Sequence, residues 1–406
     1  MALLRAEFWA EDLSEFFIAA KQLGVQSIVR PVYGYFFFIQ RSVAYAANVF
    51  PTILVPFIYA LFSFLLNAFV ASYFSRTSFA KFIPDLNLRI LLCLIFSLTG
   101  GTPEVHFNLA NSPAHLTLFI GLIVLEQQKG LKLWHVLAMI PLVGSSGSTV
   151  LLLPLIAYSF WNTKNRNFFF LFLMILSFGM ANSYLTSHSD QARKLLNWNM
   201  ITRMPQAYWE NILNRLFVLP FFGAGLSSFV MRNYFIFYTV VVLFIAFLKF
   251  RIFKADLFKN DFIRLAAIFY LGMILLFPLV AVARSYGSDN SIFIKFGIPL
   301  WKNRYSFLPA VSSILLWTVC LYPLFKDKDV FKARCAKIIF IIIAFNSIIV
   351  WPDIYKRKNL NWPEGAMAID QFVSDGNTST SFDMQEWVHP KGWLPSDGQK
   401  KIELKK

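Results

Sequence analysis

Two adjacent carboxylates near the start of the chain are the first residues whose types could do chemistry. Glu11 and Asp12 precede an amphipathic stretch, residues 13–23, whose apolar residues recur at helical spacing. A helix of this kind would lie at a membrane interface and hold the two acids there, so that one of them could act as a general base. The structural alternative is that Asp12 caps the helix that follows, with Glu15 completing a box-like pattern.

A second polar group stands between two apolar runs, in residues 102–115. It contains Glu104, His106, Asn108 and Asn111. Because polar side chains at membrane depth are costly without partners or purpose, we predict a cluster that faces a cavity, with Glu104 catalytic and the other three binding substrate. Glu104 and His106 could also belong to a metal site, but no third ligand has characteristic spacing, so a divalent cofactor (Mg or Mn) is left open. The structural alternative is a hydrogen-bonded turn with capping asparagines.

A third group lies where later apolar runs begin and end. Arg304 and Tyr305 open one run, and Arg284 closes the run before it. Arginine grips phosphate through a planar fork of N–H donors, so we predict that these three residues bind substrate. Either guanidinium could instead reach toward lipid headgroups.

The elements that must position these residues are membrane helices. Of 406 residues, 57% are hydrophobic and only 15% are charged, and the mean hydropathy is +0.55. A soluble domain has about 25% charged residues, which excludes a disordered protein, a nucleic-acid-binding domain and an ordinary cytosolic enzyme. The net charge of +16 comes from basic residues that flank apolar runs, so the membrane surface is the expected partner. The cysteines (Cys93, Cys320 and Cys335) lack metal or redox spacing, and no disulfide is expected.

Apolar runs near the length of a membrane crossing predict an all-α, polytopic helical bundle. Residues 134–160 are interrupted by a Gly/Ser-rich break at 144–148, and we predict two short helices that enter the membrane and return. With this hairpin we expect about ten crossings. The clear apolar runs are 43–72, 89–103, 113–126, 167–185, 233–250, 263–284, 305–325 and 337–351.

Basic residues predict the sidedness of the loops. Five short segments hold nearly half of the 38 Lys and Arg residues and are assigned to the cytoplasm: 73–89, 127–134, 161–167, 249–264 and 326–337. Because successive loops must alternate between the two sides, residues 213–230 are expected to lie along the outer face or dip into it. We therefore expect a transmembrane domain, 1–351, and a polar outer-face tail, 352–406. The outer loops are then 1–42, 103–112, 186–232 and 284–304.

The order of these motifs resembles the bacterial GT-C superfamily of polytopic membrane glycosyltransferases, which use polyprenyl-phosphate sugars. One largely uncharacterised group is especially similar. Residues 8–12 match its motif F-W-A-E-D, and residues 31–35, with Gln40-Arg41 less well, match a pattern like P-Y-A-G-Y followed by P-R. Residues 104–111 match E-V-x-x-N-L-A-N, and residues 304–309 match R-Y-x-x-x-P. The sequence departs from the family pattern at two places. Leu13 stands where the family has Gly, and Pro113-Ala114-His115 replaces the aromatic that usually follows the Asn-rich turn.

The resemblance implies a GT-C-like fold and transfer of a sugar, with inversion, to an envelope glycan or lipid. It implies an active site on the periplasmic face of the cytoplasmic membrane, with an acid of the first outer loop as base. By this resemblance we expect residues 1–4 to be the stub of the family's first span. A flippase or transporter of lipid-linked glycan is an alternative, as is a polysaccharide polymerase or ligase. A transporter should carry ionisable residues near the midplane, and these apolar runs are nearly free of them.

Overall fold

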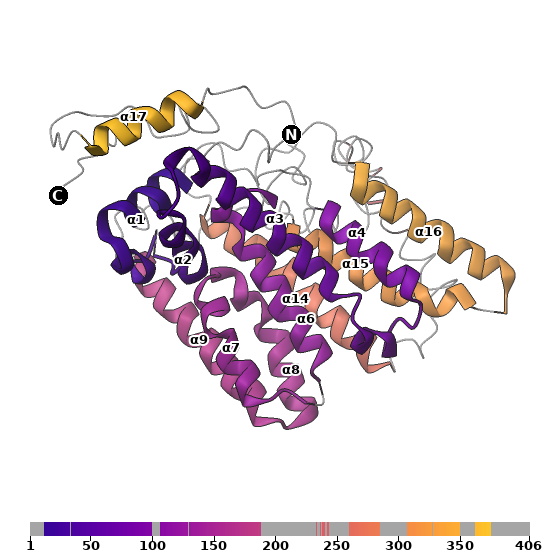
Figure 1. Ribbon diagram of the computed structural model, residues 1–406. Coiled ribbons are helices and arrows are strands. Elements are labelled where there is room, and N and C mark those ends of the chain that lie inside the picture. The colour runs from indigo at the N-terminus through magenta and orange to yellow at the C-terminus, as the bar shows by residue number, and fades with distance from the viewer. Residues whose placement is uncertain are drawn as a thin grey trace.

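The computed structural model describes residues 12–32, 34–99, 106–128, 130–187, 260–284, 307–326, 328–349 and 362–374, with isolated positions between 233 and 242. Helices make up the regular secondary structure of these residues, and the β-type pairing seen among them is a single bridge between Val32 and Tyr35. The predicted all-α fold is confirmed for this part of the chain (Figure 1).

Four helical segments are long and apolar enough to cross a membrane: Thr52–Lys81, Leu109–Glu126, Arg166–Leu185 and Phe307–Phe325. Only 22% of the apolar window in Arg166–Leu185 is buried inside the protein, so most of its surface faces outward. A long apolar helix with an exposed surface is what contact with lipid requires. These helices indicate a membrane protein, whereas the ten crossings and their orientation stay predictions.

The first described segment is helical, as the amphipathic pattern predicts. A π-helical turn, η1, covers Asp12–Phe17, and α1 covers Ile18–Leu23, followed by the 3-10 turn η2, Gly24–Val29. The apolar side chains of Leu13, Phe16, Phe17 and Ala20 are buried along it. Its location at a membrane interface stays a prediction.

The apolar run 43–72 is two helices rather than one span. Helix α2 covers Phe38–Ala47, and α3 begins only at Val55 and ends at Tyr73, after the 3-10 turn η3, Thr52–Leu54. Pro51 stands at the break, where it disfavours helical geometry in the preceding residue and supplies no N–H. The expectation of one continuous helix was wrong because Pro51 interrupts the helix, although the residues on both sides of it are apolar.

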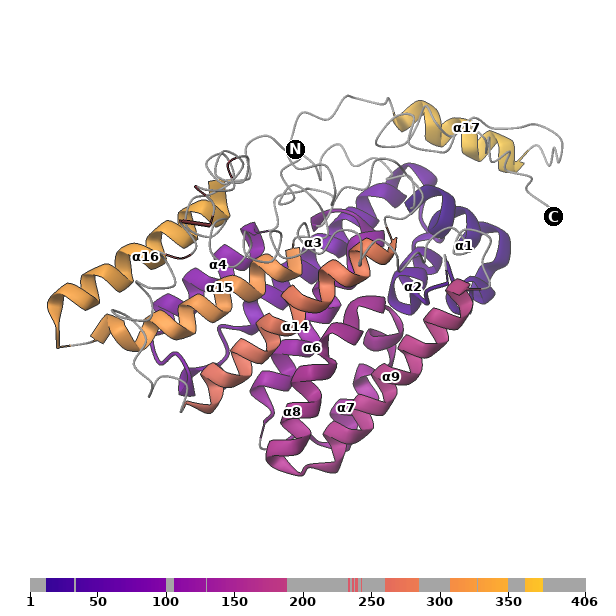
Figure 2. The ribbon, with the colours of Figure 1, turned by 180° about the vertical axis from the view of Figure 1, so that it is seen from behind.

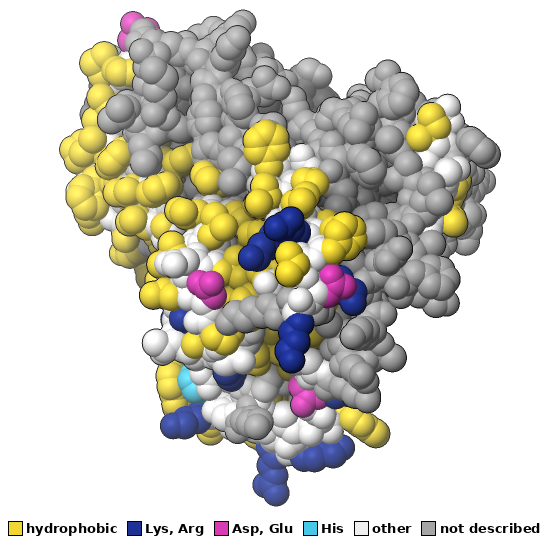
Figure 3. Space-filling model, turned by 90° about the vertical axis from the view of Figure 1, so that its right-hand side faces the viewer, with side chains coloured by type: hydrophobic (Ala, Val, Ile, Leu, Met, Phe, Trp, Pro, Cys, Tyr) yellow, Lys and Arg dark blue, Asp and Glu magenta, His cyan; other side chains and the backbone are white. Residues whose placement is uncertain are grey.

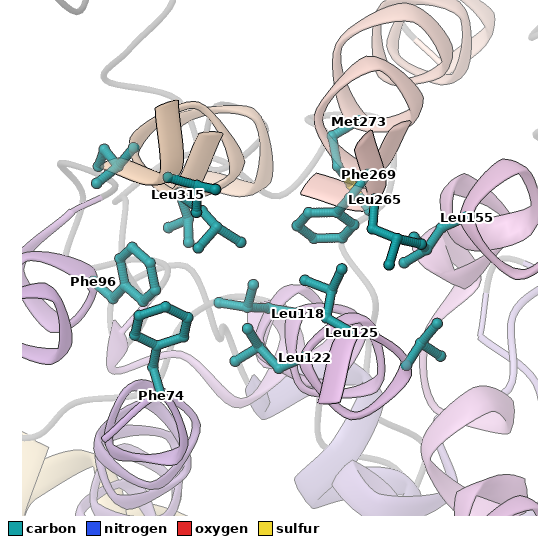
Figure 4. Packing of buried hydrophobic residues seen from close by; sticks show 14 of the residues in the cluster. Phe74, Phe96, Leu118, Leu122, Leu125, Leu155, Leu265, Phe269, Met273 and Leu315 are labelled. Atoms are coloured by element: carbon teal, nitrogen blue, oxygen red, sulfur yellow. The ribbon is translucent and has the colours of Figure 1, made fainter. Parts of the chain in front are cut away.

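Helix α6 (Pro113–Glu126) lies at the centre of the bundle, with α3, α8 (Leu153–Thr163), α14 (Asp261–Arg284) and α15 (Phe307–Leu321) around it (Figures 1 and 4). Figure 4 shows Leu118, Leu122 and Leu125 of α6 facing aromatic and aliphatic side chains of these neighbours. Gly121 lets the Phe269 ring approach, since a Cβ there would lie 2.7 Å from its Cε2 atom. The remaining elements are η4 (Thr77–Lys81), α4 (Leu86–Leu98), η5 (Leu109–Asn111), α9 (Arg166–Ser187), η13 (Tyr322–Lys326), α16 (Val330–Ile349) and α17 (Trp362–Ser374).

Residues 134–160 form the two short helices that the sequence predicts. Helix α7 covers Leu133–Gly144, and α8 covers Leu153–Thr163, after the 3-10 turn η6, Gly147–Leu152. The side-chain amides of Asn165 and Asn167 both donate to the carbonyl of Leu131, at 3.1 and 2.7 Å. The two flanks of the hairpin therefore lie at the same end of the bundle, the lower end in Figures 1 and 2.

The glycines at the apex of this hairpin are explained by close packing. A Cβ on Gly144 would lie 2.4 Å from the Phe38 ring, and a Cβ on Gly147 would lie 2.6 Å from the Tyr35 ring. Tyr35 lies just before α2, and Phe38 is its first residue. The apex of the hairpin thus packs directly against the residues at the start of α2.

Several of the predicted cytoplasmic segments contact one another. Tyr73 donates to the carboxylate of Glu126, and the Lys81 ammonium donates to the Glu126 carbonyl at 3.0 Å. The Phe82 ring stacks on that of Phe262, with ring centroids 3.5 Å apart. In Figure 3, several Lys and Arg side chains project from the lower end, below a surface rich in hydrophobic side chains. These contacts, with those of Leu131 to Asn165 and Asn167, place parts of four of the five basic segments near one another. Their assignment to the cytoplasm stays a prediction.

Candidate functional site

Asp12 joins the first segment to the turn of the second motif. Its carboxylate is 2% exposed and accepts the backbone N–H of Ala110 at 2.9 Å through Oδ1 and that of Leu109 at 3.2 Å through Oδ2. These two bonds connect Asp12 to residues that lie 97 and 98 positions further along the chain. The structure thus brings together two of the three segments that the sequence places in one site.

Asn108 lies beside this carboxylate. Its Oδ1 accepts the same N–H of Ala110, at 2.7 Å, so its side chain caps η5 while Asp12 binds the same donor. The Ser112 hydroxyl donates to the Leu109 carbonyl at 2.8 Å, and the Asn111 N–H donates to the Asn108 carbonyl at 3.2 Å. The structural alternative, a hydrogen-bonded turn with a capping asparagine, therefore describes the local geometry. The roles of Asn108 and Asn111 in binding substrate stay predictions.

His106 is buried and bonded to the backbone. Its Nε2–H donates to the carbonyl of Thr99 at 2.9 Å, which fixes the tautomer because a carbonyl only accepts. Burial lowers the pKa of His106 to about 4, against a smaller raising effect of that carbonyl, so the ring is neutral near pH 7. Its ring centroid lies 5.7 Å from that of His115. Among the residues that the structure describes, no group of three metal-ligating side chains is present.

Arg41 is the principal residue that sequence reasoning did not assign to the site. It is 2% exposed, and its guanidinium lies over the Phe16 ring, 5.6 Å from the centroid. Tyr59 of α3 is within electrostatic range of both Arg41 and Asp12. Burial lowers the pKa of Arg41 to about 10, partly offset by Glu15, so the side chain stays charged at neutral pH. The signal in the sequence was a polar pair, Gln40-Arg41, inside an aromatic and apolar stretch.

Helix α2, which carries Arg41, is held by segments far along the chain. The Ile39 N–H in its first turn donates to the Ser145 hydroxyl at 2.8 Å, so the apex of the α7–α8 hairpin caps α2. The Gln40 side-chain amide donates to the Ser112 hydroxyl at 2.9 Å. The hairpin and the turn after η5 together fix where α2 begins and therefore where Arg41 lies.

The C-terminal tail contributes one described helix, and it packs at this same end. The Trp362 indole N–H of α17 donates to the Ile53 carbonyl at 3.0 Å, and the Thr52 hydroxyl donates to Asp370 at 2.6 Å. Trp362 also joins an apolar cluster that includes Phe16 and other residues of the first segment. Residues 362–374 of the predicted polar tail are therefore part of the wall around the site.

Several predicted site residues fall outside the described part of the chain. These are Glu11, Glu104, Arg304 and Tyr305, and the predicted re-entrant segment 213–230 lies there too. Arg284 is the last residue of α14, and only its backbone is described. The three cysteines are free in the structure.

The described site is thus a buried group of polar residues, Asp12, Gln40, Arg41, Tyr59, Asn108 and Ser112, at the end of the bundle where η1, α2 and η5 meet. It holds a carboxylate and a guanidinium in fixed positions. Comparison of the chain with models of protein families, with curated proteins and with solved structures finds no match.

Proposed function

We propose that the protein is a membrane glycosyltransferase of the GT-C type, which moves a sugar from a polyprenyl-phosphate donor to an envelope glycan or lipid acceptor. The observation that carries this proposal is the bond between Asp12 and the turn at Leu109 and Ala110, in the same first segment whose Phe16 ring packs against the buried Arg41. It joins a carboxylate of the first motif to the second motif, at one end of the helices. A carboxylate and a cation are the two charges that this transfer requires.

The proposed reaction is an inverting displacement. The acceptor hydroxyl oxygen attacks the anomeric carbon, the bond from that carbon to the phosphate oxygen breaks, and the hydroxyl proton passes to a carboxylate. The electron pair of the broken bond leaves with the polyprenyl phosphate. A carboxylate oxygen can accept more than one hydrogen bond, so in this proposal Asp12 takes the proton while it also accepts the N–H groups of Leu109 and Ala110. Glu11 and Glu104 would orient Asp12 or hold a divalent metal.

The placement of ionisable groups favours an enzyme over a transporter. In the described spans these groups lie near the helix ends, with His115 in the first turn of α6 and Glu126 at its last residue. Between them α6 is apolar except for Thr117 and Gly121. A transporter is expected to bind its substrate and ions near the midplane, on broken helices.

Transfer by the intact chain tests the proposal. Membrane vesicles containing the protein would be given a panel of radiolabelled polyprenyl-phosphate sugars, and label would be followed into lipid and glycan fractions. Asp12→Asn should lower turnover by about 10²–10⁴-fold, the usual contribution of a general base. Asp85→Asn is the matched control, because Asp85 also accepts a backbone N–H but is exposed at the start of α4. Undiminished transfer by Asp12→Asn, or none by the wild type with any donor, would refute the proposal.

A further inference from the structure

The buried site contains hydrogen-bond donors that nothing in the described protein satisfies. The Nε and Nη1 atoms of Arg41 are shielded from solvent and have no hydrogen-bond partner among the described residues, and the same holds for Nδ2 of Asn108. Buried N–H donors of a charged guanidinium that lack hydrogen bonds are destabilising, and native structures rarely retain them. These atoms therefore require a hydrogen-bond partner that the described residues do not supply.

The arrangement of the neighbouring groups defines the chemistry of that partner. The Phe16 ring covers one face of the guanidinium. The groups that interact electrostatically with Arg41 are Glu15, the exposed Arg30 and the Tyr59 hydroxyl. Gln40 Oε1 is a buried acceptor without a partner among the described residues, whereas the unsatisfied atoms of Arg41 and Asn108 are all N–H donors. A group with acceptor oxygens and negative charge complements them, and phosphate fits the planar fork of an arginine.

An apolar surface begins close to Arg41 along the chain. The end of α2, the turn η3 and the start of α3 expose a series of large hydrophobic side chains, and such a surface suits an isoprenoid or acyl chain. The exposed residues are Tyr45, Val49, Phe50, Ile53, Leu54 and Phe57. The phosphate that Arg41 would bind is therefore expected to be attached to a lipid.

We infer that Arg41, assisted by Asn108, binds the phosphate of a polyprenyl-phosphate substrate at the end of the bundle where η1, α2 and η5 meet. The inference rests on the proposed function and deepens it, because it assigns the phosphate contact to Arg41 rather than to Arg304 or Arg284. Arg41 donates from Nε and Nη1 to two phosphate oxygens, and the Asn108 amide donates to a third acceptor.

Ligand-dependent stabilisation of the purified full chain in detergent tests this assignment without requiring turnover. The unfolding midpoint would be measured with polyprenyl monophosphate, with polyprenol lacking the phosphate, with inorganic phosphate and with phosphatidylglycerol. We expect the first to raise the midpoint and the other three to have little effect. Arg41→Met should weaken binding of polyprenyl monophosphate about 10- to 100-fold, and Arg41→Lys should restore it only in part. Arg30→Gln, which removes an exposed charge nearby, should bind as the wild type does.

The ligand-free variant gives an independent readout. Because Arg41→Met replaces a buried, unsatisfied charge with an apolar side chain of similar length, its ligand-free midpoint should equal or exceed that of the wild type. A purely structural arginine would instead give a lower midpoint. If Arg41→Met does not fold, this expectation has failed, and the comparison of polyprenyl monophosphate with polyprenol in the wild type still decides whether phosphate is recognised.

The outcomes separate this inference from the proposed function. Equal affinity of the wild type and Arg41→Met for polyprenyl monophosphate would overturn the inference, as would equal stabilisation by polyprenol, inorganic phosphate or phosphatidylglycerol. Phosphate binding that depends on Arg41, without sugar transfer from any donor, would support the phosphate site and refute the glycosyltransferase. Sugar transfer that survives in Arg41→Met would leave the enzyme standing and remove Arg41 from donor binding.

Discussion

Replacing Asp12 by asparagine should destabilise the fold by an amount that the hydrogen-bond geometry allows us to work out. Both carboxylate oxygens accept a backbone N–H, from Ala110 and from Leu109. An asparagine has only one acceptor oxygen, so its NH₂ group must face one of these two donors. The better orientation turns the NH₂ toward Ala110, because the Ala110 N–H retains its bond to the Asn108 side chain.

The cost in this orientation is the loss of one charge-assisted hydrogen bond and the weakening of the other. Hydrogen bonds to charged groups contribute about 1.5–3 kcal/mol each, so Asp12→Asn should lower the free energy of unfolding by about 2 kcal/mol. Asp12→Ala should cost more, about 3–5 kcal/mol, because it also leaves the Leu109 N–H buried without this acceptor. Asp12→Asn is therefore expected to lower stability, although asparagine and aspartate have nearly the same shape.

Thermal unfolding in detergent, monitored by circular dichroism, measures this effect, with Asp85→Asn as control. Asp85 accepts the Leu88 N–H at 3.2 Å from an exposed position, where asparagine caps a helix about as well as aspartate. Asp85→Asn should stay within about 0.5 kcal/mol of the wild type. If Asp12→Asn unfolds like Asp85→Asn, the two bonds to η5 contribute nothing to stability and the reasoning fails. Transfer assays on Asp12→Asn must be run below its own unfolding midpoint.

Three further substitutions test other contacts by the same unfolding measurement. Gly144→Ala would place a Cβ 2.4 Å from an aromatic ring and should cost about 1–3 kcal/mol. Tyr73→Phe removes a hydrogen bond to Glu126 and should cost about 1–2 kcal/mol. Burial lowers the pKa of His106 to about 4, so the folded state binds fewer protons than the unfolded chain below pH 6.5. Stability should fall by about 3 kcal/mol as the pH drops from 6.5 to 4, and His106→Gln should remove that part of the loss.

Each of these expectations has a control or a contrary outcome. Gly130→Ala should be tolerated, since only a side-chain oxygen lies near its Cβ position, at 3.9 Å, and a similar cost at both glycines would contradict the packing argument. Tyr45→Phe, at an exposed tyrosine, should be neutral. An unchanged pH profile in His106→Gln would mean that other groups set the acid sensitivity.

Local patterns made the helices predictable. The apolar run 113–126 coincides with α6, and the Gly/Ser-rich break at 144–148 lies between α7 and η6, because hydropathy and backbone breakers act where they stand. Pro51 offered a similar signal for the break between α2 and α3, but the hydropathy on both sides of it outweighed it. Parts of four of the five basic segments lie near one another, and their side of the membrane stays a prediction.

The candidate site was predictable only in part, because its contacts join distant segments. The sequence singled out Asp12 and the turn at 104–111, yet the partners of Asp12 are backbone N–H groups, which leave no mark in a sequence. The burial of Arg41 depends on Phe16, Ser112 and Ser145, of which the last two lie more than 70 residues away. An arginine next to an apolar run is ordinarily assigned to the surface, and only the tertiary docking of α2 overrides that.

In the proposed function, the short hairpin of α7 and α8 would set the depth of the site in the bilayer. Helix α7 has 12 residues and rises about 18 Å, less than the ~30 Å thickness of the hydrocarbon layer. With its loops at one membrane surface, its apex ends inside that layer, and α2 rests on the apex through Ser145. Arg41 would then sit in a recess below the opposite surface, where water is scarce and charges attract strongly. A lipid phosphate could reach it without leaving the membrane, while the acceptor would have to come down to meet it.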